Sequence, residues 1–93
     1  MAVLVHIPAF LQPFAGGRAR VVLDVAPATV SEVLAELWRV HPGVRDRVVD
    51  EQGRVRQHVN VFVGTESIRF TGGVATAVPD GSSVSIVPAV SGG

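Results

Sequence analysis

The residues with the clearest potential for chemistry are the last two, Gly92 and Gly93. Pro88 precedes them where a run of strand-forming residues ends, and it cannot continue a central strand because it lacks a backbone N–H. A backbone without Cβ atoms can approach a surface where any side chain would clash. We therefore expect a flexible tail over residues 88–93 that can place a terminal carboxylate in a partner's active site. An isolated Gly-Gly ending is also consistent with a floppy terminus that has no function.

No other group of residues forms a convincing site. The three histidines, His6, His41 and His58, have no carboxylate at ligand spacing, so neither a metal site nor a catalytic base is expected. The pairs Gly16-Gly17 and Gly72-Gly73 lack the lysine of a phosphate-binding loop. No serine lies in a Gly-x-Ser-x-Gly motif. The sequence therefore predicts no catalytic residue, no metal and no bound cofactor, and favours a protein substrate or carrier over an enzyme.

Composition limits the partners and the setting. The 93 residues predict one domain over residues 1–93, with 47% hydrophobic and 17% charged residues. A net charge of zero gives no electrostatic reason to expect nucleic acid or an anionic membrane as a partner. Cysteine is absent, and the start has neither a basic leading region nor a run long enough to span a membrane. We expect a cytoplasmic protein. All eight cationic residues are arginine, so no side-chain amine is available for an isopeptide bond.

Hydrophobic periodicity predicts the elements that must position the tail. A capping box at Thr29 and Glu32 begins a helix with one apolar stripe, and Pro42-Gly43 ends it. Trp38 lies on that stripe and is expected in the core. A short helix over 44–50 is possible. Alternating residues predict strands at 2–7, 18–25, 58–63 and 83–87, with a possible edge strand at 68–70 and a brief extended piece at 74–78.

The order of these elements predicts an α+β fold. We expect a mixed sheet of four to five strands with one main helix packed on one face, in two layers around a single core. The first and last strands would run parallel as neighbours, because a long crossover separates them. The loop over 8–17 would fold Phe10, Leu11 and Phe14 back over the core.

At its C-terminal end the sequence resembles the MoaD/ThiS family of ubiquitin-like sulfur carriers, which have the β-grasp fold. The resemblance covers the whole order of elements. It is most specific where an Asp-Gly turn leads a strand into a proline and then a Gly-Gly terminus, here Asp80-Gly81, Val84, Pro88, Val90 and Gly92-Gly93. The residues at 59–63, Arg69-Phe70 and 72–76 are most similar to carriers serving an O-phosphoserine-dependent cysteine synthase. Ser82-Ser83 departs from the pattern, where an acidic residue often follows Asp-Gly.

The resemblance implies a chemistry for the tail. In this family an E1-like adenylyltransferase and sulfurtransferase uses ATP to adenylate the terminal carboxylate, which becomes a thiocarboxylate and donates sulfur to a synthase. Gly93 would carry the sulfur, and the tail threading the partner's active site would consist of Pro88, Ala89, Val90, Ser91 and Gly92. A cysteine-synthase-like acceptor is favoured. The alternatives are the small subunit of molybdopterin synthase, a ubiquitin-like modifier conjugated through Gly93, and an interaction module without tail chemistry.

A docking surface is expected on the sheet face that points away from the helix. Leu4, Phe62 and Val87 alternate away from the core and would form one apolar patch beside the base of the tail. Phe62 is the expected aromatic anchor of this patch. Burial of the patch under a loop is the competing interpretation. Arg54, Arg56 and Arg69 could pair with an acidic partner rim, although solvated surface explains each of them as well.

Overall fold

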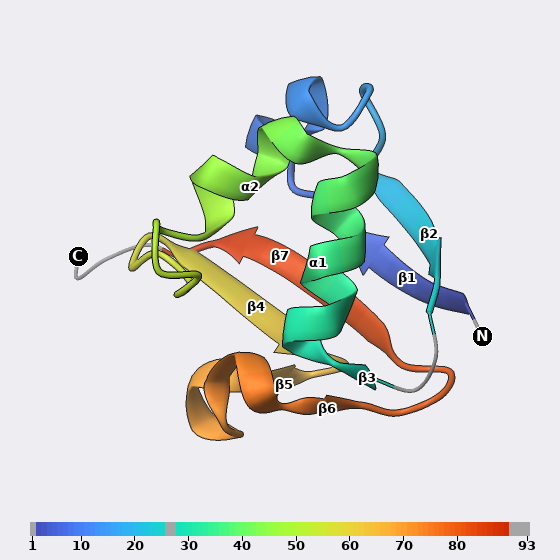
Figure 1. Cartoon of the computed structure of the whole chain (residues 1–93), viewed down its shortest axis with the longest axis vertical. Helices are drawn as coiled ribbons and strands as arrows, with labels where there is room; N and C mark the ends of the chain where they lie inside the picture. Colours follow the sequence, from blue (N-terminus) through green and yellow to red (C-terminus); the bar gives the residue numbers. More distant parts are fainter. Residues whose placement is uncertain (1, 26–27, 90–93) are drawn as a thin grey trace.

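The computed structural model describes residues 2–25 and 28–89 (Figure 1). Its main sheet is mixed, with the strand order β2-β1-β7-β4-β5. These strands span β1 (Ala2–His6), β2 (Arg20–Asp24), β4 (Val59–Val63), β5 (Glu66–Ser67) and β7 (Ser83–Pro88). β1 and β7 pair in parallel, while β1 with β2, β4 with β7 and β4 with β5 are antiparallel. The predicted parallel pairing of the first and last strands is confirmed.

Two helices cover one face of this sheet (Figure 1). α1 (Val30–Val40) begins at a complete capping box, because the Thr29 hydroxyl accepts from the Glu32 amide and the Glu32 carboxylate accepts from the Thr29 amide. α2 (Pro42–Val48) follows directly, with Pro42 in its first turn. Pro42 therefore ends α1, as predicted, and at the same time begins the next helix.

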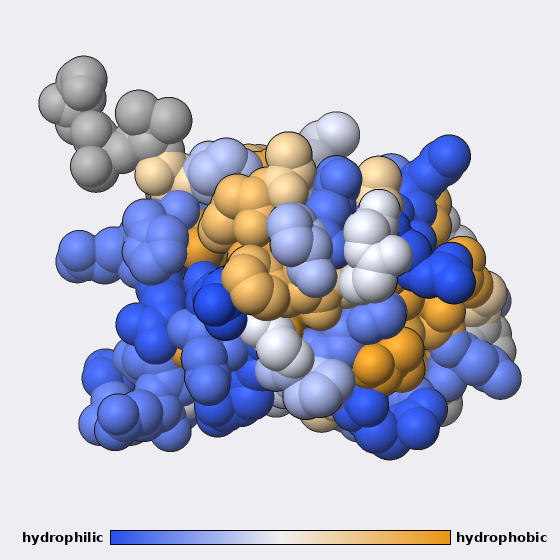
Figure 2. Space-filling model, turned by 90° about the horizontal axis from the view of Figure 1, so that it is seen from above, coloured by the Kyte–Doolittle hydropathy of each residue, from blue (hydrophilic) through white to orange (hydrophobic). Residues whose placement is uncertain are grey.

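The hydrophobic core lies between the helices and the sheet. Val3, Val5, Val84 and Ile86 face it from β1 and β7, and Leu37 faces it from α1. Trp38 is half-buried and packs against the edge of the core instead of within it. No charged or polar residue among those described is fully buried. Viewed from the end that carries α2, hydrophobic residues at the surface form separate areas divided by hydrophilic ones (Figure 2).

The structure corrects the predictions for three connecting segments. Residues 8–17 contain a 3₁₀ helix, η1 (Ala9–Phe14), in which only Leu11 is buried. Phe10 and Phe14 are 43% and 37% exposed, so they do not fold over the core. The short edge strand is β5, and Ile68–Phe70 forms the 3₁₀ helix η2. A two-stranded sheet of β3 (Ala28–Thr29) and β6 (Ala77–Val78) was not predicted, and the 3₁₀ helix η3 (Gly73–Ala75) precedes β6.

Candidate functional site

The end of β7 is held by β4 up to residue 89. Val59 lies opposite Pro88, and the Ala89 amide donates to the His58 carbonyl oxygen at 2.8 Å. At the other end of this strand pair, the Gly64 amide donates to the Ser83 carbonyl oxygen in the same register. In an antiparallel pair, hydrogen-bonded positions alternate with non-hydrogen-bonded ones. The Ala89–His58 bond is therefore the last rung of this ladder within the described residues.

The same alternation explains why a proline fits in a strand with neighbours on both sides. Pro88 and Val59 occupy a non-hydrogen-bonded position, so the backbone nitrogen of Pro88 faces away from β4 and toward the side of β1. β1 pairs with β7 only as far as Ser85. No strand needs a hydrogen bond from residue 88 on that side, so proline costs the sheet nothing.

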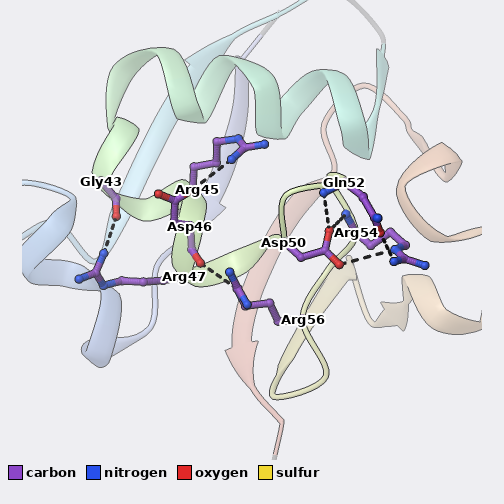
Figure 3. Close-up of polar contacts among 8 residues, drawn as sticks. All are labelled: Gly43, Arg45, Asp46, Arg47, Asp50, Gln52, Arg54 and Arg56. Atoms are coloured by element: carbon purple, nitrogen blue, oxygen red, sulfur yellow. Dashed lines mark hydrogen bonds and ion pairs between the residues drawn. The ribbon is translucent and has the colours of Figure 1, made fainter.

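The loop between α2 and β4, residues 49–58, adjoins the end of β7 and is braced by arginines (Figure 3). The Arg56 guanidinium donates to the Asp46 carbonyl oxygen at 2.8 Å. Arg54 contacts both Gln52 and Asp50. A backbone bridge between Val49 and Val55 closes the loop. We call residues 49–58 the braced loop; its last residue, His58, supplies the carbonyl that holds Ala89.

Asp50 stabilises the turn within the braced loop. Its carboxylate accepts from the backbone amides of Gln52 and Arg54 at 2.9 and 3.0 Å (Figure 3). The hydrogen bond from the Arg54 amide is the main cause that lowers the pKa of the Asp50 carboxyl below its ordinary value. The turn is therefore best held when this carboxyl is ionised.

Arg69 fixes the junction of the braced loop with β4 by binding two backbone carbonyls there. Its Nη2 donates to the carbonyl oxygens of Gln57 and Val59, at 3.0 and 2.9 Å. These carbonyls flank His58, so one guanidinium holds the segment that in turn holds Ala89. Sequence reasoning treated Arg69 as a surface residue or as part of a rim for an acidic partner. Its actual contacts lie ten and twelve residues earlier in the chain, and no local pattern predicts them.

An open hollow lies beside the end of β7 on the outer face of the sheet. Phe62 and Val87 line it together with Asn60, Arg69 and Pro88. Phe62 and Val87 are both half-buried, and the register places Val87 opposite Asn60, next but one to Phe62 along β4. The structure therefore brings together two of the three residues of the predicted docking patch.

Leu4 lies apart from these two residues. It is half-buried on β1 opposite Ser83, whereas Phe62 lies on the far side of β7 opposite Ser85. Two serines of β7 thus interrupt the apolar surface that was expected to be continuous. The nearest apolar neighbour of Leu4 on this face is Val22 of β2, its cross-strand partner, which is 68% exposed.

The predicted tail is only partly covered by the structure. Pro88 is the last residue of β7, and the Ala89 amide is still bonded to the sheet. The tail expected from residue 88 therefore begins no earlier than residue 90. Val90, Ser91, Gly92 and the predicted sulfur-carrying Gly93 lie outside the described residues.

Other kinds of site find little support in the described part of the chain. Over residues 2–25 and 28–89, no three histidine or acidic side chains gather at a distance suited to a metal ion. In the same ranges, no helix has the length and apolar character needed to cross a bilayer.

Comparison with known proteins places this geometry in a family. A model of the ThiS family matches residues 5–93. The sulfur carrier protein CysO of Mycobacterium tuberculosis is 40% identical over an alignment of 95 residues that covers 100% of both chains.

Solved structures agree with the sequence comparison. The crystal structure of the BexX/CysO complex of Amycolatopsis orientalis contains a chain that superposes with a TM-score of 0.86 at 38% identity, covering 99% of this chain and 100% of that one. SAMP1 of Haloferax volcanii, a small archaeal modifier protein, superposes with a TM-score of 0.81 at 30% identity and full coverage of both chains. The predicted β-grasp, ubiquitin-like fold is confirmed by these neighbours.

Proposed function

The chain belongs to the ThiS family and is a homologue of the sulfur carrier protein CysO, and on this basis we propose that it carries sulfur as a thiocarboxylate on Gly93. The family match reaches residue 93 and so includes the Gly-Gly ending. The single observation that carries the proposal is the hydrogen bonding at the end of β7. The ladder of β7 with β4 continues to the Ala89–His58 bond, the last one within the described residues, and so holds the chain directly before the segment that would enter a partner.

The proposed chemistry has two steps, both catalysed by a partner. The Gly93 carboxylate attacks the α-phosphorus of ATP, which forms an acyl adenylate and releases pyrophosphate. Hydrosulfide then attacks the acyl carbon, AMP leaves with the electron pair of the broken C–O bond, and the thioacid that forms loses its proton to leave a thiocarboxylate. The glycines suit both attacks because a Cβ at residue 92 or 93 would crowd the carbonyl in a narrow pocket. ATP would be bound by the E1-like partner and not by this chain.

We propose that the hollow beside β7 docks the partners. Phe62 supplies its largest apolar group, and Arg69 supplies a cation at its rim. Asn60 adds a polar side chain to the lining of the hollow. A partner loop with an apolar side chain and a polar group would match this surface. Since the hollow lies at the base of the tail, docking there would direct residues 90–93 into the partner.

The acceptor of the sulfur is proposed to be a cysteine-synthase-like enzyme. The similarity to CysO over the full length of both chains supports this choice. A second candidate is conjugation to other proteins through Gly93, which the similarity to small archaeal modifier proteins supports. Both candidates share the activation step and differ in what attacks the activated Gly93.

Deletion of Gly93 tests the activation step. The truncated chain is expected to keep the melting temperature of the full chain, because every described core contact lies before residue 90. It is also expected to lose ATP–pyrophosphate exchange with a cognate E1-like enzyme. A Met1 deletion serves as the matched terminal control and should keep both properties. Exchange that survives the loss of Gly93 would refute the proposal.

A further inference from the structure

A second hollow lies between η1, α2 and the braced loop, and we call it the α2 hollow. The residues that line it are Phe10 of η1, Asp46 and Arg47 of α2, and Arg56 and His58 of the braced loop. His58 is also the residue whose carbonyl oxygen holds the Ala89 amide. Its neighbour Gln57 lines the hollow beside β7. The two hollows therefore adjoin consecutive residues at the base of the tail, and a protein that takes the tail beyond Ala89 meets both.

The side of the α2 hollow formed by η1 is apolar. Phe10 and Phe14 stay exposed because only Leu11 of this 3₁₀ helix reaches the core. The Arg47 Cζ atom lies 3.6 Å from the centroid of the Phe14 ring, which is a cation–π contact. This contact holds the Arg47 guanidinium against η1. Aromatic and arginine side chains are enriched in protein interfaces, so the composition of this surface favours a protein as its partner.

The carboxylates near the α2 hollow are engaged by arginines that do not line it. Asp46 lines the hollow, but its Oδ1 pairs with Nη1 of Arg45 at 3.1 Å (Figure 3). Arg45 itself lines a different groove, together with residues of α1. Asp50 of the braced loop pairs with Arg54 at 3.5 Å and accepts two backbone amides as well. The cations of the α2 hollow are therefore not neutralised by these two carboxylates.

Arg47 and Arg56 keep hydrogen-bonding capacity for a ligand. A guanidinium carries several N–H donors, and each of these two uses one of them for a backbone carbonyl. Nη1 of Arg47 donates to Gly43 at 3.2 Å, and Nε of Arg56 donates to Asp46 at 2.8 Å (Figure 3). Neither forms an ion pair within the described residues. These bonds orient two guanidinium groups in advance, and the fork of an oriented guanidinium matches a carboxylate.

We propose that the α2 hollow docks an acidic segment of the enzyme that activates the tail. Carboxylates of this segment bind Arg47 and Arg56, and an apolar side chain beside them packs on Phe10. The inference rests on the function proposed above, in which Gly93 is adenylated by a partner. The activating enzyme is the occupant because the carrier and the modifier candidates both require it. Contacts in the two hollows hold the protein on both sides of the tail base while the tail enters the active site.

Charge removal tests the docking by isothermal titration calorimetry of the full chain with a cognate E1-like enzyme at low and moderate salt. Arg47→Gln and Arg56→Gln keep a donor for the same backbone carbonyls and remove the charge. Each variant is expected to weaken binding by about tenfold at low salt, and the affinity of the double variant should depend less on salt. Arg39→Gln is the matched control, because Arg39 pairs with Glu36 and does not line the hollow. It should bind like the original chain.

ATP–pyrophosphate exchange separates docking from chemistry. The arginine variants should raise the KM for the carrier and leave kcat near its original value, because Gly93 is unchanged. If the original chain supports no exchange even at saturating concentration, the proposed function fails, while calorimetry still decides the docking.

Circular dichroism checks that each variant is folded, and Arg47→Gln decides the test if Arg56→Gln disturbs the braced loop. Folded variants that bind the enzyme as tightly as the original chain overturn the docking proposal. So does an original chain that does not bind, an equal loss of affinity in Arg39→Gln, or a loss confined to the sulfur-accepting synthase.

Discussion

The backbone amide of Ala89 donates a 2.8 Å hydrogen bond to the carbonyl oxygen of His58, which belongs to the braced loop. This bond extends the ladder of β4 and β7 one residue beyond Pro88, the last residue of β7. The segment proposed to enter a partner is thus anchored on the braced loop, which two arginines hold. Arg56 donates to the Asp46 carbonyl oxygen, and Arg69 donates to the Gln57 carbonyl oxygen.

Replacement of Arg69 by alanine is expected to loosen the base of the tail. The change removes the charged donor shared by the Gln57 and Val59 carbonyls and should destabilise the fold by about 1–2 kcal/mol. Amide exchange at Ala89 should accelerate more than exchange at Ile86, in the centre of β7. Hydrogen exchange followed by NMR measures both, and Arg39→Ala, which removes an exposed arginine of α1 outside the braced loop, is the control. Equal exchange at Ala89 in the original chain and the Arg69 variant would refute the anchoring role.

Replacement of Phe62 by alanine is expected to weaken binding to the E1-like partner. A buried aromatic anchor commonly accounts for about 2 kcal/mol or more of binding energy, so the dissociation constant should rise about thirtyfold or more. The loss of fold stability should stay near 1 kcal/mol, because Phe62 is only half-buried, against about 3–5 kcal/mol for a core phenylalanine. Isothermal titration calorimetry and urea unfolding measure the two effects.

Phe70 provides the matched control for this measurement. It is 87% exposed and does not line the hollow, so Phe70→Ala should change neither affinity nor stability appreciably. If both variants lose affinity equally, docking is not centred on the hollow. A stability loss as large as that of a core residue would place Phe62 in the core and remove it from the docking surface.

Asp50 is expected to contribute to the pH dependence of stability. Hydrogen bonds from the Arg54 and Gln52 amides lower its pKa in the folded chain, so its contribution is full above the ordinary aspartate pKa. It is lost as the pH falls through the lower folded pKa. The difference in unfolding free energy between the original chain and Asp50→Asn should therefore shrink on acidification. Urea unfolding at a series of acidic pH values measures it, and a difference independent of pH would contradict the assignment.

Local sequence signals correctly predicted those elements whose capping residues or apolar pattern lie within the element itself. The capping box at Thr29 and Glu32 and the stripe of α1 are both present in the structure. Alternation correctly assigned the inward residues Val84 and Ile86 of β7. Such patterns are local because helix and strand periods repeat within a few residues. For the same reason they placed Phe62 and Val87 on the outer face but did not give the strand register, which sets Ser83 and Ser85 of β7 between Leu4 and Phe62.

The features that sequence reasoning missed depend on contacts made by the fold. Ile68–Phe70 reads as a strand from its apolar residues, yet it forms a 3₁₀ turn in which the Ser67 side chain accepts from the Arg69 amide. That turn directs the Arg69 side chain to carbonyls ten and twelve residues away. The 3₁₀ helix at Ala9–Phe14 likewise follows from one buried residue, Leu11, rather than from a periodic stripe. Tertiary packing determined the conformation of these segments, and no local sequence pattern indicates that packing.

The central claim is that Gly93 carries sulfur, and intact-mass analysis of the protein purified from its native cells tests it most directly. We expect a species heavier by the difference between one sulfur and one oxygen atom, with fragmentation locating the change to Gly93. A chain that lacks Gly93, expressed in the same cells, should show no such species. A mass that never changes, sulfur located at another residue, or Gly93 found only in stable adducts with lysines of other proteins would contradict the claim.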